Sequence, residues 1–120
     1  MKKNYFIVLI LLLFTGTIEA QKEKIKEAEK ELNSGNIQNA ITILKSIEYQ
    51  VYNSKDDERA QYYFIQGSSY LGLADKKTDE GKNLVLAAKS YRETIKIESE
   101  SGKRKYSGQI ETSFKSLKTN

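Results

Sequence analysis

The sequence contains no cysteine, histidine, tryptophan or proline. Without cysteine, no disulfide bond can hold the domain together, so its stability must come from packing. Because histidine and cysteine are both missing, Ser–His and Cys–His nucleophile pairs and zinc sites built from the usual ligands are excluded. Proline is the residue that breaks helices most sharply. Its absence, together with the lack of alternating strand patterns, predicts an all-α fold.

Long apolar runs are also scarce, and the clearest one lies at the N-terminus. Lys2 and Lys3 precede the run from Tyr5 to Phe14, and a more polar segment then ends at Ala20. This order is typical of a signal peptide and predicts cleavage near Ala20, with export to the periplasm or out of the cell. An uncleaved anchor is the alternative, although the run is shorter than the roughly 20 apolar residues that span a bilayer.

An excess of one charge is missing as well. The chain has 20 Lys and Arg against 16 Asp and Glu, a net charge of +4. Removal of residues 1–20 takes away two lysines and one glutamate, which leaves +3. A nucleic-acid-binding domain usually concentrates its basic residues in a patch, so this mixed balance does not indicate a nucleic-acid partner. Residues 21–120 are long enough for one small domain.

Apolar residues then recur at steps of three and four, which is the spacing of one helical face. The spacing predicts helices over 22–33, 37–52, 57–74, 83–98 and 103–117. Gly35 is expected to end the first helix in a left-handed conformation, and Asp56 or Asp57 to cap the third. Polar residues and Gly81 predict an extended loop over 74–83.

Each predicted helix carries one apolar stripe. The stripes comprise Ile25, Ala28 and Leu32; Ile37, Ala40, Ile41, Leu44, Ile47 and Val51; Ala60, Tyr63, Phe64, Gly67, Tyr70, Leu71 and Ala74; Leu84, Ala87, Ala88, Tyr91 and Ile95; and Tyr106, Ile110, Phe114 and Leu117. No helix can bury its stripe alone, so the helices must pack against one another. The small residues Gly67, Ala87 and Ala88 lie among bulky aromatic residues, which allows the two central helices to approach closely and interlock.

Part of this pattern repeats along the chain. The repeated positions are Ala28, Gly35, Asn36, Ile37, Ala40, Ile41, Leu44 and Ile47 in a first unit, and Tyr63, Gly67, Tyr70, Leu71, Ala87, Tyr91 and Ile95 in a second. The pattern resembles that of the tetratricopeptide repeat family. The resemblance implies a fragment of a right-handed α-solenoid, with antiparallel helical hairpins over 22–52 and 57–98 and a C-terminal helix that either caps the array or begins a third unit. The family pattern has about eight residues fewer between Tyr70 and Ala87, which also points to an extended loop there.

The resemblance further implies a concave groove for a protein or peptide partner, lined by the first helix of each unit. The positions that would face it are Lys22, Ile25, Glu29, Leu32, Gln61, Phe64, Ser68 and Leu71. Tyr63 and Tyr70 are expected in the core. Phe64 is either an aromatic anchor of the groove or a core residue covered by the terminal helix.

These observations favour an exported, non-catalytic interaction module or scaffold that binds a protein or peptide. No catalytic residue, metal site or cofactor is predicted, because the acidic clusters 56–58 and 79–80 lie where carboxylates cap helices. The alternative is a helical protein that binds an anionic membrane surface or a polyanion through the basic run of Lys103, Arg104 and Lys105. An enzyme that uses carboxylates is a third hypothesis, and it requires a pocket in which two carboxylates converge.

Overall fold

The computed structural model describes residues 20–119, with side chains described as far as residue 115. The first helix covers residues 20–33. It is followed by α2 (Ile37–Ser46), α3 (Glu48–Val51), α4 (Asp56–Asp75), α5 (Glu80–Ser101) and α6 (Ser107–Thr119). No strand occurs between residues 20 and 119, so the predicted all-α class is confirmed for this part of the chain. The predicted signal peptide lies outside the described residues apart from Ala20, and no described helix is long and apolar enough to cross a membrane.

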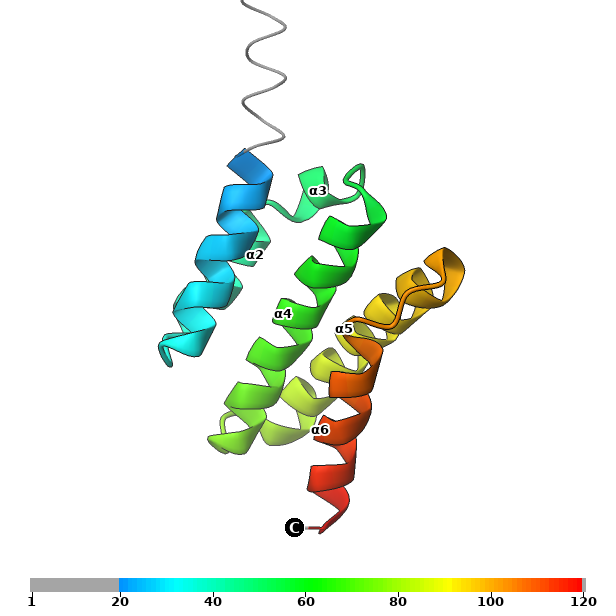
Figure 1. Cartoon of the computed structure of the whole chain (residues 1–120). Coiled ribbons are helices and arrows are strands. Elements are labelled where there is room, and N and C mark those ends of the chain that lie inside the picture. Colours follow the sequence, from blue (N-terminus) through cyan, green and yellow to red (C-terminus); the bar gives the residue numbers. More distant parts are fainter. Residues whose placement is uncertain (1–19, 120) are drawn as a thin grey trace, which may run out of the picture.

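The helices lie in two layers around α4. Figure 1 shows the first helix, α4 and α6 towards the front, with α2 and α5 behind them. Helix α4 packs against α2 and α3 on one side and, most extensively, against α5 on the other. Helix α6 packs against α5. Because α4 has neighbours on both sides, it needs two buried faces.

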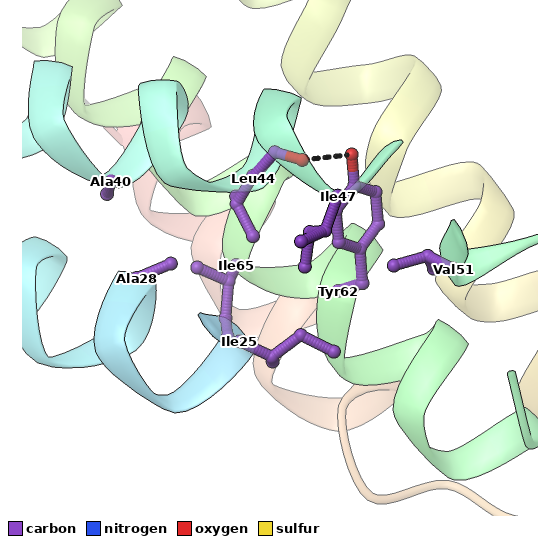
Figure 2. Packing of buried hydrophobic residues seen from close by; sticks show 8 residues of the cluster. All are labelled: Ile25, Ala28, Ala40, Leu44, Ile47, Val51, Tyr62 and Ile65. Carbon is purple, nitrogen blue, oxygen red and sulfur yellow. Dashed lines mark hydrogen bonds between the residues drawn. The ribbon is translucent and has the colours of Figure 1, made fainter. Parts of the chain in front are cut away.

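The first of these faces belongs to a core shared with the first helix, α2 and α3 (Figure 2). The residues of this cluster are Ile25, Ala28, Ala40, Leu44, Ile47, Val51, Tyr62 and Ile65. The stripes predicted for 22–33 and 37–52 are therefore confirmed. In α4, however, the fully buried aromatic residue is Tyr62, only 2% exposed, whereas the predicted Tyr63 and Tyr70 are half-buried. A single stripe was the wrong expectation for a helix that packs on two sides.

The second face of α4 meets α5. Ala87 and Tyr91 are buried as predicted, but Ala88 is exposed and Ile95 is 42% exposed. Their places in the contact are taken by polar residues: Thr94 Oγ1 donates a hydrogen bond to the Ala60 carbonyl oxygen at 3.0 Å. Polar groups can be buried when they are hydrogen-bonded, so a stripe of apolar residues alone does not describe this interface.

Several helix boundaries differ from the predicted ones. The helix predicted over 37–52 is interrupted at Ile47, which separates α2 from α3. The predicted loop over 74–83 is much shorter, because only residues 76–79 connect α4 to α5. Asn83, placed at the end of that loop by the sequence, is buried in α5, where its side chain donates a hydrogen bond to the Thr78 carbonyl oxygen at 2.6 Å. The additional residues of the second hairpin therefore lengthen its helices.

The starts of two helices also differ. Asp56 and Asp57 lie in the first turn of α4, and Lys55 takes the N-cap position predicted for one of them. The terminal helix, predicted from residue 103, begins at Ser107. Gly35 has the predicted left-handed conformation, with φ of 87°.

Candidate functional site

The groove predicted between the first helix and α4 has no apolar floor. Ile25 is 1% exposed and belongs to the core, and Leu32 packs against the same core. The exposed pair at this position is polar, because Gln61 Nε2 donates a hydrogen bond to Glu29 Oε2 at 3.0 Å. A hollow of about 460 Å³ lies beside this bond. Its lining residues are Lys26, Glu29, Lys30, Asn33, Ser34 and Gln61.

Phe64, left open between a groove anchor and a core residue, is half-buried among aromatic rings. Its ring stacks on Tyr106 at a centroid distance of 4.5 Å and lies 5.9 Å from the ring of Tyr91. Ser68, another predicted groove position, shares a hydrogen bond of 3.0 Å with the Tyr91 hydroxyl, and Leu71 is half-buried. Phe64 and Ser68, which were expected to meet a peptide in the second unit, are thus engaged with the segment that leads into α6 and with α5.

A second hollow, of about 190 Å³, lies where the start of α4 meets the end of α5. Four carboxylates line it, each with a partner. Asp56 Oδ1 lies 3.3 Å from Arg59 Nη1. Asp57 Oδ1 lies 2.6 Å from Lys103 Nζ, and Glu58 Oε1 lies 3.6 Å from Lys22 Nζ, another predicted groove residue. The fourth is Glu98, whose side chain is directed at the start of α6.

Glu98 determines where α6 begins. Its Oε1 accepts hydrogen bonds from the backbone amide of Ser107 at 2.8 Å and from the Ser107 hydroxyl at 2.7 Å. Both carboxylate oxygens also lie 3.0 Å from the Tyr106 amide nitrogen. A carboxylate in this position satisfies free amides at a helix N-terminus and is favoured by the helix dipole. A residue of the preceding helix therefore caps α6, which explains why helix formation starts four residues later than predicted.

The electrostatics of this hollow do not suit proton donation. Burial of Glu98, which is 3% exposed, would raise its pKa, but the hydrogen bonds from Ser107 and Tyr106 outweigh burial and hold the pKa below its ordinary value. The hydrogen bond and the charge of Lys103 lower the pKa of Asp57. A general acid needs a pKa near the working pH, whereas these two carboxylates are ionised at neutral pH and are weak bases. Within the described residues, no three acidic side chains are grouped as metal ligands would be.

The predicted basic patch is not a single surface. Lys103 is paired with Asp57, and Lys105 Nζ lies 5.3 Å from the centre of the Tyr106 ring. Arg104 points elsewhere: it is exposed and forms no ion pair with any residue that the structure describes. Lys103 is therefore the one member of this run that an ion pair with a described residue neutralises, and the three side chains have three different surroundings.

Arg104 lines a groove that the sequence did not predict. This α5–α6 groove has an apolar part formed by Ile95, Ile110 and Phe114, and a charged rim formed by Arg104, Glu111 and Lys115. Ile95 and Phe114 are 42% and 39% exposed. The sequence did contain a signal for this groove. The terminal helix has an apolar stripe and Ile95 is apolar, yet the predicted arrangement has no further helix that could cover them.

Comparison with known proteins gives no independent guide to function. Protein-family models, curated proteins and solved structures all give no match to this chain. The function must therefore be argued from the surfaces, and the α5–α6 groove is the described hollow with the most exposed large apolar side chains.

Proposed function

We propose that the protein is an exported, non-catalytic interaction module of tetratricopeptide-like architecture that binds another protein. One observation carries this proposal: Ile95 and Phe114 are exposed together in a groove floored by the buried Ile110. Apolar side chains gathered in one hollow mark interaction sites more often than single exposed ones do. Among the residues whose side chains the structure describes, the other large exposed apolar ones are Tyr49, Tyr52 and Val85, and none of them lines a described hollow with another.

The rest of the molecule supports a scaffold role. Close packing of Gly67 against Tyr91 and the bond from Tyr62 to Leu44 fix the helices relative to one another. A rigid frame lowers the entropy cost of presenting a binding surface. The tetratricopeptide-like part of the proposal is supported by the two-layer order of the helices and by the left-handed turn at Gly35. Export is supported by the charge and apolar pattern of residues 1–20.

Site-specific photocrosslinking tests the proposal. A photoreactive amino acid replaces Glu111 on the rim of the α5–α6 groove, and a second sample carries it at Lys45, an exposed position near the end of α2. We expect the sample labelled at 111, irradiated in extract of the cells that encode the protein, to give one defined protein adduct that mass spectrometry identifies. The Lys45 sample should not give this adduct. Identical adducts from both positions, or none from position 111, would contradict the proposal.

A further inference from the structure

We infer that the α5–α6 groove binds an amphipathic helix of another protein whose apolar face is flanked by carboxylates. The inference rests on the proposed function and adds the chemistry of the partner. It is carried by the shape of the groove, the charges on its rim and an apolar floor that gives a peptide backbone no hydrogen-bond partners.

The groove continues beyond the hollow that Phe114 lines. A neighbouring hollow is lined by Ser99 and Gly102 at the end of α5. It shares Ile95, Arg104 and Ser107 with the hollow that Phe114 lines. The two hollows, of about 420 and 440 Å³, therefore form one depression along α5 and α6. An elongated depression between two helices accepts the ridge of a third helix, whose side chains fill it at intervals of three and four residues.

The walls favour a helix over an extended peptide. Apolar side chains form the floor, and the amide and hydroxyl of Ser107 are already bonded to Glu98. An extended peptide laid over such a floor would leave its own amides without partners, which is costly. A helix satisfies its backbone internally and can lie on an apolar floor without this penalty.

The rim selects the charge of the partner. Arg104 has no ion pair among the described residues, and Lys115 is balanced by Glu111 at 3.4 Å. In the hollow that Phe114 lines, Arg104 thus leaves one uncompensated positive charge beside Ile95. The neighbouring hollow adds Lys103, which is paired with Asp57, and the buried Glu98 carboxylate, which is hydrogen-bonded to Tyr106 and Ser107. A carboxylate next to the apolar face of the incoming helix would be attracted to Arg104, whereas a lysine there would be repelled.

Two other occupants fit less well. A second copy of the chain would have to offer a helix with an exposed apolar stripe, yet the exposed Tyr49 and Tyr52 lie on and directly after α3, which has only four residues. A bilayer needs side chains that protrude, whereas more than half of Ile95 and of Phe114 is already covered by the walls of the groove. A helix with a narrow apolar ridge reaches such side chains better than a flat surface does.

Binding of synthetic helices to the purified protein tests the inference. The probes are two fluorescein-labelled peptides with leucine at i, i+3, i+4 and i+7, one with glutamate and one with lysine at the flanking positions. We expect fluorescence anisotropy to show saturable binding of the glutamate peptide and at least tenfold weaker binding of the lysine peptide. Ile95→Gln should weaken binding of the glutamate peptide about fivefold. Arg104→Glu should weaken it about tenfold and strengthen binding of the lysine peptide.

Matched controls separate specific effects from misfolding and from other occupants. Val85→Gln replaces another exposed apolar residue of α5, and Lys45→Glu reverses another exposed charge, so both should leave binding unchanged. Equal binding of both peptides, or binding unaffected by Ile95→Gln and Arg104→Glu, would overturn the inference. Stronger, Ile95-dependent binding to vesicles of anionic lipid would overturn it in favour of a membrane, and concentration-dependent dimerisation lost in Ile95→Gln would overturn it in favour of self-association. Crosslinking at position 111 can also be repeated with the glutamate peptide as a competitor. If a protein adduct forms and the peptide does not reduce it, the proposed function stands and this inference fails.

Discussion

Gly67 on α4 faces the ring of Tyr91 on α5 so closely that a Cβ atom at position 67 would lie 2.6 Å from Tyr91 Cδ1. Contacts this short force one helix or the ring to move. The absence of a side chain at position 67 is therefore what allows the two longest helices to pack in register. The hydrogen bond between Ser68 and the Tyr91 hydroxyl holds the ring in this position.

The first prediction concerns this contact. Gly67→Ala is expected to lower the free energy of unfolding by about 2 kcal/mol, because overpacking outweighs the better helix propensity of alanine. Gly81→Ala is the matched control, since a Cβ there meets no described atom within 4 Å. Urea denaturation followed by circular dichroism should show Gly81→Ala to be neutral or slightly stabilising. Equal stability of the two variants would contradict the close packing of α4 on α5.

The second prediction concerns the Tyr62 hydroxyl, which donates a hydrogen bond to the Leu44 carbonyl oxygen at 3.1 Å inside the core (Figure 2). Burial raises the pKa of Tyr62, so the hydroxyl is neutral and remains a donor at physiological pH. Tyr62→Phe should lower the free energy of unfolding by about 1 kcal/mol, the usual contribution of one such bond. Tyr49→Phe, at a position that is 89% exposed, should have no effect in the same chemical denaturation experiment.

The third prediction concerns acid. Because the pKa of Glu98 is lower in the folded protein than its ordinary value, its ionised form stabilises the fold. That stabilisation is complete well above the ordinary pKa of 4.5 and is lost as the pH falls below this value and through the lowered pKa of the folded protein. Glu98→Gln should lower the free energy of unfolding by about 2 kcal/mol at pH 7 and make stability less dependent on pH between about 5 and 3.

Denaturation curves at several pH values check this, with the exposed Glu100→Gln, two residues away on α5, as control. Hydrogen exchange at pH 7 localises the effect, since amides of α6 should lose protection in Glu98→Gln while those of α2 keep it. An unchanged pH profile in Glu98→Gln would show that the buried carboxylate does not hold α6.

The fourth prediction separates Phe64 from the α5–α6 groove. Because Phe64 stacks on Tyr106, Phe64→Ala should cost about 2 kcal/mol of stability and increase hydrogen exchange in α6. Under conditions where the variant remains folded, hydrogen exchange gives the fraction of molecules in which α6 is unfolded. The affinity for the glutamate peptide should fall only as much as this fraction accounts for. Ile95→Gln should show the opposite behaviour, with stability unchanged and binding reduced. A binding loss in Phe64→Ala at full α6 protection would instead restore the predicted groove.

The sequence predicts the fold best where a helix buries one face. The first helix and α2 each turn one face to the shared core, so the stripes that include Ile25 and Leu44 match it. Helix α4 packs on two sides, and its buried residues therefore do not follow one stripe, which is why Tyr62 was missed in favour of Tyr63. The α4–α5 interface also buries Thr94, whose partner is the Ala60 carbonyl oxygen on the other helix. The spacing of apolar residues within one helix cannot predict a hydrogen-bond partner on another helix.

The candidate site was predicted less well than the fold for a related reason. The start of α6 is set by Glu98, nine residues before Ser107, so the predicted helix over 103–117 began too early. Because α6 starts later, Tyr106 stacks on Phe64, which is then no longer available as an aromatic anchor. Arg104 lines the same hollow as Ile95. The charge run 103–105 was visible in the sequence, but its division among three environments depends on the turn that precedes α6.

The attachment of α6 also has a mechanical consequence. Near its start α6 is tied down by the Glu98 carboxylate, and along its length Ile110 and the ring of Phe114, which lies 5.9 Å from that of Tyr91, hold it. Tension applied to the C-terminal end would load these few contacts one after another, while the bonds between α4 and α5 remain in parallel and share the load. In a single-molecule pulling trace α6 should peel away at low force, before the paired helices rupture.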